Sequence, residues 1–553
     1  MSDLGSANHI AGVWMSDVIR RFWPQLEHVG KTELILICFV AVALLAIVAP
    51  KIRIPYPILL TIGGVVLALI PGVPTIHLEP ELVFNLFLPP LLYPAAVYTS
   101  WRDFRTNLRP ILLMATVLVV ITMAATAGVF HSLTGLPLAV AFVFGALISP
   151  PDAVAALSFT QNLQVPRKII VILEGESLVN DATSFISFRF AVAAVMTGTF
   201  SLGQASLQFL FVATGGLCVG LAVGCVATQV QKRLDNPPVQ TMFSLLTPYL
   251  AYFSGERLHV SGILAVVIAG MYYGWRAPRI LSGSMRLLAM PVWEMVLFIL
   301  NGILFMLIGL QLPQVIRALP PGSALQVVKL AVFVLLVMVL VRFSWMFGAT
   351  YLPRFFSRTF RRKNRISWQH TALISWTGMR GADSLAGALA IPFLLPNGEP
   401  FPGRNLILLL TFGVIFGTLV LQGLTLAPLV RWLGIEDDHA TEREEKLARL
   451  KANEAALAHV EEMEALHRTN PKTAERLRSE YLDRIQQLRS EGPPEKTVRR
   501  LFSRDFEDLA HEALETERET VIGLRNDEII SDQALRRIQR DIDLAEARLQ
   551  RPA

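Results

Sequence analysis

Long apolar runs recur along most of this sequence, and they constrain its fold more than any other feature. The runs are roughly 17–25 residues long, which at a helical rise of about 1.5 Å per residue is enough to cross a hydrocarbon core of about 30 Å. Of the 553 residues, 53% are hydrophobic and only 17% are charged, against about 25% charged in soluble proteins. The sequence therefore predicts an all-α polytopic membrane protein that lies in a lipid bilayer.

Thirteen candidate spans can be placed on these runs. They cover about residues 33–50, 54–71, 81–99, 110–131, 137–160, 168–197, 206–231, 238–254, 260–275, 291–313, 324–352, 367–393 and 405–433. Alternate loops hold about eighteen Lys and Arg, whereas the intervening loops hold about three. Because basic loops stay in the cytoplasm, this asymmetry places the C-terminus inside. The N-terminus then lies outside, where Arg20, Arg21 and Lys31 fit the rule poorly.

The composition divides the chain into three parts, residues 1–32, 33–434 and 435–553. The first part shows no signal-peptide pattern, and its apolar residues at helical spacing predict an interfacial amphipathic helix. The second part holds all the apolar spans. The third part has 28 acidic and 21 basic residues, so the basic balance of the whole chain reflects cytoplasmic loops near anionic lipid and gives no reason to expect nucleic acid as a partner.

The last part predicts a cytoplasmic helical tail. Leu447, Leu450 and Leu457 recur at near-heptad spacing among strong helix formers, and "EGPP" at 491–494 separates this helix from those that follow. A solvated helical tail and a regulatory or dimer-associated segment are both consistent with this pattern. The three cysteines, Cys38, Cys218 and Cys225, lie in apolar runs without a metal-binding spacing and are expected to be buried.

Acidic residues inside the predicted spans need a specific explanation. They are Asp152, Glu174, Glu176, Asp181, Glu294 and Asp383. An unpaired charge at the bilayer centre costs at least about 2.5–3.5 kcal/mol. Glu294 lies near a cytoplasmic end and is expected to face headgroups. The others are expected to face a cavity, a partner or a transport path.

The sixth span, "ILEGESLVNDATSFISFR", carries a polar patch. Ser177 and Asp181 are one helical turn apart, and Glu176 and Asn180 form a second such pair on the adjoining face. These oxygens suit a hard cation, and a desolvated carboxylate without its cation is driven toward protonation. The patch therefore predicts a site that holds either a cation or a proton.

A structural reading of the same acids remains open. In that reading the acids hold helices together through Arg189 and Arg380, and for Glu174 this is the preferred interpretation. It needs no ion, and it differs from the first reading in the partners that each carboxylate is expected to have.

Two of the spans are interrupted. In "AFVFGALISPPDAVAALSF", Pro150 and Pro151 remove backbone donors just before Asp152, which frees carbonyls near mid-membrane as cation ligands. A proline kink with Asp152 capping the next half-helix is compatible with this reading. In "ALISWTGMRGADSLAGALAIPF", Gly378 and Gly381 flank Arg380. The matching places of the two breaks predict inverted repeats with two crossed broken helices.

Three motifs, "SPPDAVAALSF", "LEGESLVNDATSFISFRFA" and "GMRGADSLAGALAIP", resemble in order and spacing the monovalent cation:proton antiporter-1 family of NhaP- and NHE-type sodium/proton exchangers. The resemblance covers roughly residues 33–433. It implies a homodimer of thirteen-helix protomers, each with a dimerisation part and a core part that moves against it like an elevator.

The resemblance also implies roles for individual residues. Asp181 is the residue that exchanges cation for proton, with Asn180 beside it and with Ser177, Glu176 and Asp152 near the ion. Asp181 and Asp152 are thus the carboxylates expected to contact the cation. The Asn-Asp pair accompanies electroneutral exchange in the family, and Arg380 is expected to hold the crossed half-helices through a carboxylate, for which Glu176 is the candidate.

Two positions depart from the family pattern. Pro151 stands where the family commonly has Thr, so only a carbonyl remains there as a ligand. Asp383 stands where the family commonly has an apolar residue. It is expected either to pair with Arg380 at i+3, which is the preferred reading, or to add a carboxylate to the ion path.

The sequence as a whole predicts a secondary-active antiporter that exchanges Na+, Li+ or K+ for H+ across a bacterial inner membrane and serves pH and cation homeostasis. No cofactor is expected beyond the transported ions, and no enzymatic activity. A K+/H+ antiporter is the nearest alternative. A cation channel would need carboxylate rings along a pore, and an intramembrane aspartyl protease would leave the second motif without a role.

Overall fold

The computed structural model describes ten stretches and four single positions of the chain. They are residues 31–52, 56–70, 83–152, 165–199, 201–281, 283–317, 324–356, 367–435, 440–489 and 513–524, with 527, 538, 542 and 544. The interfacial helix predicted within residues 1–32 lies outside the described residues, apart from the two that begin α2. The chain divides into two compact units, Met1–Asp438 and His439–Ala553.

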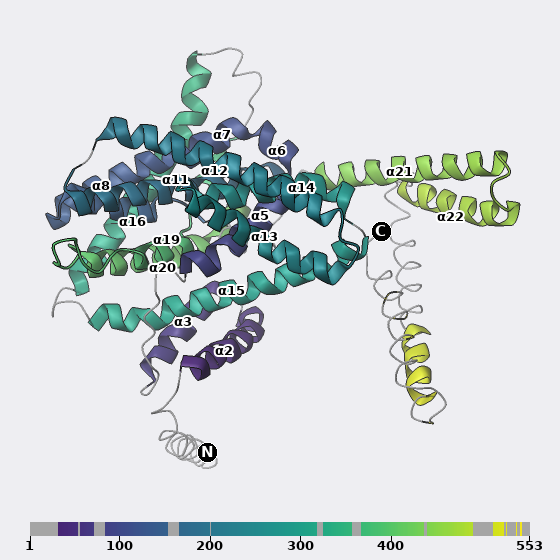
Figure 1. Cartoon of the computed structure of the whole chain (residues 1–553), viewed down its shortest axis with the longest axis horizontal. Helices are drawn as coiled ribbons and strands as arrows, with labels where there is room; N and C mark the ends of the chain where they lie inside the picture. The colour runs from purple at the N-terminus through teal and green to yellow at the C-terminus, as the bar shows by residue number, and fades with distance from the viewer. Residues whose placement is uncertain are drawn as a thin grey trace. The chain divides into compact units, whose positions relative to one another are not determined.

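The first unit is helical, and its described residues contain no strand beyond one isolated bridge between Leu394 and Pro400. Its helices are labelled in Figure 1. In chain order they are α2 (Lys31–Ile52), α3 (Tyr56–Leu69), η1 (Val83–Phe87), α5 (Leu88–Tyr98), α6 (Trp101–Thr106), α7 (Leu108–Leu112), η2 (Leu113–Leu118), α8 (Val119–Thr134), α9 (Leu138–Ile148), α11 (Arg167–Thr197), α12 (Leu202–Gln231), α13 (Pro237–Arg257), α14 (Gly262–Ile280), α15 (Gly283–Arg317), α16 (Ala324–Phe356), α18 (Trp368–Trp376), α19 (Ala382–Leu389) and α20 (Arg404–Trp432).

These helices lie at the positions of the predicted spans. Six stretches of the described residues are long and apolar enough to cross a membrane, namely 108–134, 167–197, 203–231, 285–313, 325–352 and 404–433. Shorter apolar helices occupy 36–49, 58–69 and 138–148. The helical membrane architecture is therefore confirmed, whereas thirteen crossings and inverted repeats remain predictions.

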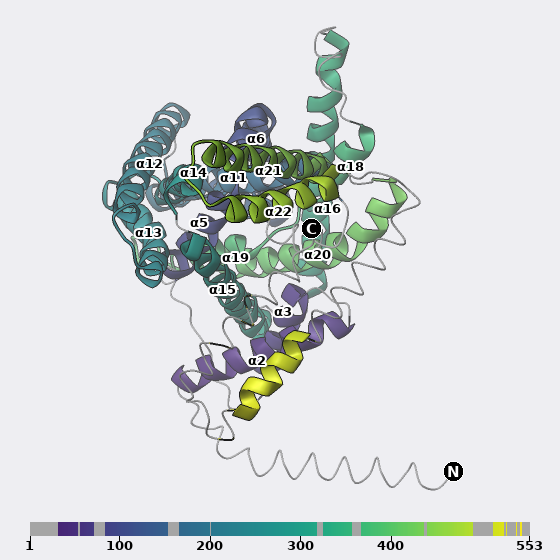
Figure 2. The same cartoon turned by 90° about the vertical axis from the view of Figure 1, so that its right-hand side faces the viewer.

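Two groups of helices can be recognised from their packing. The helices α12, α13 and α14 pack on one another, and α5 packs on α14. The helices α9, α19 and α20 pack together, and α16 packs on α18 and α20. Figures 1 and 2 show α12–α14 together on one side and α16, α19 and α20 on the other, with α11 between them. Helix α11 contributes side chains to the hydrophobic cores of both groups.

Small residues allow close packing within the α12–α14 group. Gly216, Gly220 and Gly224 follow one stripe of α12, and a Cβ on any of them would press into α14 at Ser261, Ala265 or Ala269. Such stripes let helix backbones approach in membranes. Cys218 and Cys225 lie off this stripe and are exposed, so their predicted burial is wrong, whereas Cys38 is buried as expected.

Helices end at both predicted breaks; residues 153–164, which follow the first break, lie outside the described residues. Helix α9 ends at Ile148, two residues before Pro150, and the missing N–H groups of Pro150 and Pro151 leave the carbonyls four residues earlier without helical donors. Helix α18 ends at Trp376, and α19 begins at Ala382 after a short irregular segment. The chain is therefore irregular at two places in the middle of an apolar unit.

The second unit contains α21 (Ala440–Ala465) and α22 (Pro471–Arg489), which pack on each other. Arg478 pairs with Glu464, and Arg489 Nη2 lies 2.6 Å from Glu454 Oε1. The later residue on α22, Arg489, pairs with the earlier residue on α21, Glu454, so the two helices run antiparallel and form a hairpin. Leu447 is exposed, and the "EGPP" segment lies outside the described residues.

Candidate functional site

Helix α11 brings three polar side chains into the protein interior. Glu176, Asn180 and Asp181 are 1%, 0% and 3% exposed. Their neighbours along α11, such as Leu178 and Ala182, belong to the hydrophobic core. Ser177, one turn before Asp181, is half-buried. The polar patch predicted from the sequence therefore lies inside the protein.

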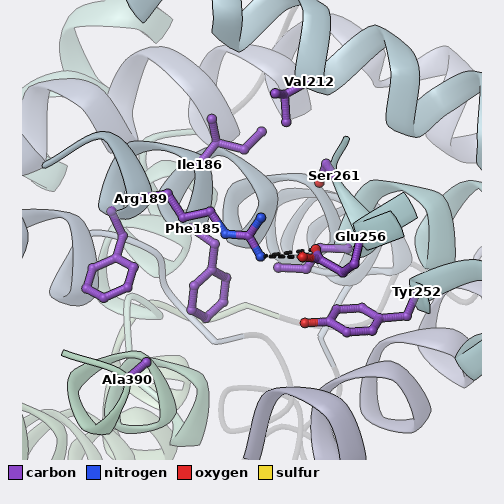
Figure 3. A pocket seen from close by; sticks show the side chains of 11 residues that line it. Phe185, Ile186, Arg189, Val212, Tyr252, Glu256, Ser261 and Ala390 are labelled. Atoms are coloured by element: carbon purple, nitrogen blue, oxygen red, sulfur yellow. Dashed lines mark hydrogen bonds and ion pairs between the residues drawn. The ribbon is translucent and has the colours of Figure 1, made fainter. Parts of the chain in front are cut away.

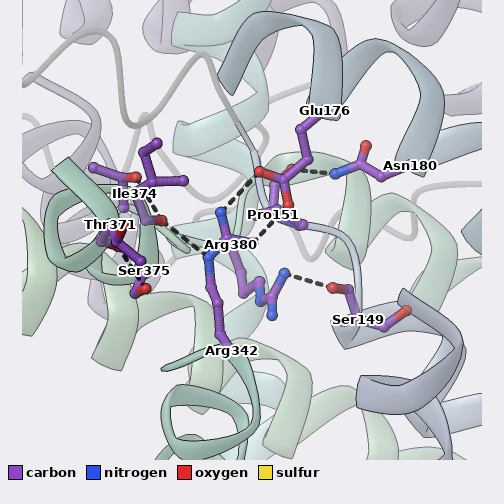
Figure 4. A network of polar contacts seen from close by, with 10 residues as sticks. Ser149, Pro151, Glu176, Asn180, Arg342, Thr371, Ile374, Ser375 and Arg380 are labelled. Atoms are coloured by element: carbon purple, nitrogen blue, oxygen red, sulfur yellow. Dashed lines mark hydrogen bonds and ion pairs between the residues drawn. The ribbon is translucent and has the colours of Figure 1, made fainter. Parts of the chain in front are cut away.

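The first helix break lies directly against this patch. The Asn180 side chain donates a hydrogen bond of 2.8 Å from Nδ2 to the Pro151 carbonyl oxygen (Figure 4). One residue later, the Asp152 backbone N–H donates to the Met379 carbonyl, also at 2.8 Å. Since Met379 belongs to the second break, the two irregular segments meet beside α11.

Arg380 binds the end of the first half-helix. Its Nη1 donates to the Ser149 carbonyl at 2.6 Å, and its backbone N–H donates to Thr418 Oγ1 at 3.1 Å. The carbonyls at a helix C-terminus lack intrahelical donors and carry partial negative charge. A guanidinium supplies both hydrogen-bond donors and a positive charge. The predicted pair between Arg380 and Glu176 is wrong: in the described part of the chain, Arg380 binds a backbone carbonyl.

The partner of Glu176 is Arg342 of α16. Two parallel hydrogen bonds join Arg342 Nη1 and Nη2 to Glu176 Oε1 and Oε2, at 2.6 and 2.8 Å. Arg342 Nε also donates to the Ile374 carbonyl of α18 at 3.2 Å. With side chains 4% and 1% exposed, the pair joins α11, α16 and α18 in the protein interior (Figure 4).

Arg342 was missed by the sequence reasoning. A signal for it existed, because Arg342 is a charged residue in the middle of the run "VFVLLVMVLVRFSWMF". An ionisable residue in such a run is expected to have a partner. The physical rule that singles out the buried acids therefore applies equally to Arg342.

Asp383 lies in the first turn of α19. Its charge and that of Asp152 both act electrostatically on Asp181. No hydrogen bond or ion pair joins Asp383 to Arg380 among the described residues, so the preferred reading of Asp383 is wrong. Its place at a helix N-terminus is favourable for a carboxylate. Gly381 is required beside it, because a Cβ there would overlap the Asp152 carboxylate.

The other predicted structural residues have partners of their own. Arg189 binds Glu256 of α13, with Nη2 lying 3.0 Å from Oε1 and 2.9 Å from Oε2. It does not hold an acid of α11. Glu174 is half-buried and its charge interacts with Arg167 near the start of the same helix.

Asp181 differs from Glu176 in having no basic partner. Within the described part of the chain, no hydrogen bond or ion pair satisfies its carboxylate. The charge of Asp152 acts on Asp181. The Asn180 side chain, adjacent in sequence, binds the Pro151 carbonyl, and its Oδ1 has no hydrogen-bond partner among the described residues. Among the described residues no group of three or more His, Cys, Asp or Glu side chains is arranged to hold a metal ion. A cation at Asp181 would therefore take carbonyl, amide and carboxylate oxygens together.

Comparison with known proteins gives a consistent result. Residues 37–432 match the family model described as "Sodium/hydrogen exchanger, transmembrane". An uncharacterized Na+/H+ exchanger of Mycobacterium tuberculosis (strain ATCC 25618 / H37Rv) is 33% identical over 537 residues, which is 95% of this chain and 98% of that protein. A sodium, potassium, lithium and rubidium/H+ antiporter of Bacillus subtilis (strain 168) is 34% identical over 447 residues, which is 79% of this chain and 66% of that protein.

A solved structure has the same fold. The sodium proton antiporter MjNhaP1 from Methanocaldococcus jannaschii at pH 8 matches with a TM-score of 0.60 and 18% identity, covering 73% of this chain and 99% of that one. The resemblance seen in the three motifs is thus confirmed over most of the membrane unit. This chain belongs to the sodium/hydrogen exchanger family of monovalent cation:proton antiporters.

Proposed function

We propose that this protein is a secondary-active antiporter that exchanges cytoplasmic Na+, or another monovalent cation, for external H+ across a bacterial plasma membrane. The observation that carries the proposal is the environment of Asp181. This carboxylate is 3% exposed, lies where the two helix breaks meet, and has no basic partner among the described residues. Leaving such a carboxylate charged and unpaired is costly, so it must take up a proton or a cation.

The arrangement around Asp181 accounts for coupling of the two ions. Arg342 already neutralises Glu176, and Arg380 is engaged with the Ser149 carbonyl. Neither guanidinium is therefore a partner for Asp181, and its charge has to be balanced by the transported ion. If only the neutralised site crosses between the inward-facing and outward-facing states, each cation that leaves is replaced by a proton. One carboxylate exchanging one ion for another makes the cycle electroneutral.

The ligand set supports a monovalent cation without selecting one. The Pro151 carbonyl and Asn180 Oδ1 are neutral oxygen ligands that accept Na+, Li+ or K+ alike, and selectivity depends on cavity size and ligand number. The B. subtilis relative is named for sodium, potassium, lithium and rubidium. We therefore include K+/H+ exchange within the proposal, and the ion series below distinguishes it.

The remaining parts of the proposal concern the setting of the exchanger. The basic loops on one side of the predicted spans support a cytoplasmic location for the C-terminal hairpin. Exposed apolar side chains of α12, among them Leu207, Leu210 and Phe211, offer a surface for lipid or for a second protomer, and we propose a homodimer. Net uptake of H+ in exchange for cation suits a role in pH and cation homeostasis.

The proposal is tested with purified protein in liposomes that carry an imposed pH gradient. Na+, Li+ and K+ are added in turn. Each ion that the protein transports is expected to dissipate the pH gradient, and the exchange is expected to produce no net current. Asp181→Asn is expected to abolish the response, while Arg167→Gln, which alters an exposed ion pair at the start of α11, should keep it. Full activity of Asp181→Asn would contradict the assignment. A current that needs no counter-ion would indicate a channel instead.

A further inference from the structure

A cavity lies beside α11, on the C-terminal side of Asp181 along that helix (Figure 3). Its volume is about 220 Å³. One wall is formed by α11 and by Ala390, just after α19, and the opposite wall by α12, α13 and α14. The cavity therefore lies where the helices that carry the exchange site meet the α12–α14 group. Neither Asp181 nor the residues at the two helix breaks line it.

One broad face of α11 connects Asp181 with this cavity. Asp181, Phe185 and Arg189 follow one another at intervals of four residues, so two turns of helix and about 12 Å separate the first from the last. Phe185 and Arg189 line the cavity, whereas Asp181 does not. The path from the cavity to the exchange carboxylate therefore passes the Phe185 side chain.

Phe185 fills this position closely. It is 6% exposed, and a Cβ on Gly387 of α19 would lie 3.1 Å from its Cε1 atom. The same added Cβ would press into Leu147 of α9. The Phe185 ring is thus packed against α9 and α19, and along α11 it lies between Asp181 and the cavity-lining Arg189.

An ion pair crosses the cavity outside Phe185. Arg189 of α11 donates to both carboxylate oxygens of Glu256 on α13, at 2.9 and 3.0 Å (Figure 3). Gly262 of α14 leaves room for this carboxylate, since a Cβ there would lie 3.0 Å from Glu256 Oε1. The two side chains are 57% and 28% exposed. A pair with this exposure changes an equilibrium by at most about fivefold, so it can form and break in every cycle.

We infer that this cavity is the external vestibule of the ion path, and that the Arg189–Glu256 pair with Phe185 forms its closed gate. The loops at this end of the helices are those that the sequence predicts to be external. The paired state ties α11 to α13 and keeps water from Asp181. When α11 and the half-helices move against the α12–α14 group, the Arg189–Glu256 pair separates. Phe185 moves with α11 away from the side chains of α13 and α14 with which it shares a hydrophobic core, and Glu256 is free to attract the incoming cation or proton. The inference rests on the proposed function.

The gate is tested by thiol labelling at Val212, which lines the cavity from α12 and is half-buried. Cys38, Cys218 and Cys225 are first replaced by Ser, and Val212→Cys is then added. A membrane-impermeant thiol reagent is applied from outside to right-side-out vesicles. Arg189→Gln and, separately, Glu256→Gln are each expected to raise the labelling rate by up to about fivefold. The reversed pair Arg189→Glu with Glu256→Arg is expected to restore the slow rate.

The control is Arg167→Gln, because Arg167 forms a comparable pair with Asp103 at 2.7 Å and with 43% and 29% exposure. It lies at the opposite end of α11 and should leave the rate unchanged. Equal labelling in all variants, or labelling only from inside, would overturn the gate. Cation/proton exchange by the unaltered protein is measured in parallel vesicles. If the unaltered protein shows no exchange, the proposed function is contradicted. If exchange is intact but the labelling rate is the same in all variants, only the gate is contradicted.

Discussion

The buried pair between Glu176 and Arg342 yields the sharpest prediction. Arg342→Met keeps a flexible, unbranched apolar stem but removes the guanidinium, and with it the two hydrogen bonds to Glu176 and one to the Ile374 carbonyl. Glu176, at 1% exposure, is then left without a cation. Breaking a buried pair in this way costs about 3–5 kcal/mol, which lowers the folding equilibrium constant by about two to almost four powers of ten.

The loss of stability arises from the Glu176 carboxylate left buried without its guanidinium. Removing both charges should therefore destabilise the protein less than removing Arg342 alone. Glu176→Gln combined with Arg342→Met leaves no ion in the interior, and the double variant is expected to be more stable than the Arg342→Met single variant. A double-mutant cycle should therefore give a coupling energy of about 2 kcal/mol or more. The same cycle on the exposed Arg167–Asp103 pair should give about 1 kcal/mol or less.

The measurement is reversible denaturant unfolding of purified protein in detergent micelles, with the four members of each cycle compared under identical conditions. Additive effects at Glu176 and Arg342 would refute the reasoning. So would an Arg342→Met variant that is no less stable than Arg167→Met, because burial would then not determine the value of the pair.

Two further predictions concern the helix breaks. Gly381→Ala is expected to reduce exchange by at least about tenfold, because the added Cβ displaces the Asp152 carboxylate. Gly348→Ala is the control: Gly348 has open space around it, so this variant should retain full exchange in the same liposome assay. Equal activity of the two variants would refute the steric argument. Asp383→Ala is expected to raise the Na+ concentration for half-maximal exchange several-fold, about fivefold for 1 kcal/mol of lost attraction, because it removes a charge that acts on Asp181. An unchanged half-maximal concentration would mean that Asp383 has no part in cation binding.

Much of the site was predictable from local sequence. Pro150 and Pro151 cannot continue a helix, so the first break was determined by the covalent structure of the chain. Asp181 and its neighbours stood out because an ionisable group inside an apolar span needs a partner. Asn180 and Pro151, which are joined by a hydrogen bond, and the adjacent Asp181 all follow from these local rules.

Partners of the charged residues were not predictable in the same way. Glu176 was expected to bind Arg380, yet it binds Arg342, which is 166 positions away in the sequence. Asp383 is only three residues from Arg380, and that spacing favoured a local pair. The Arg380 side chain instead reaches the Ser149 carbonyl, because carbonyls at the end of a helix lack intrahelical donors and carry partial negative charge.

The sequence by itself determined that this chain forms apolar helices, that two of them break, and which carboxylates lie inside. These are consequences of covalent geometry and of the absence of water in the bilayer, and both act on short stretches of chain. Only the tertiary structure decided which guanidinium neutralises which acid, and thereby left Asp181 without a basic partner among the described residues. That choice depends on which helix faces pack together, and helix packing brings residues together irrespective of their distance along the chain.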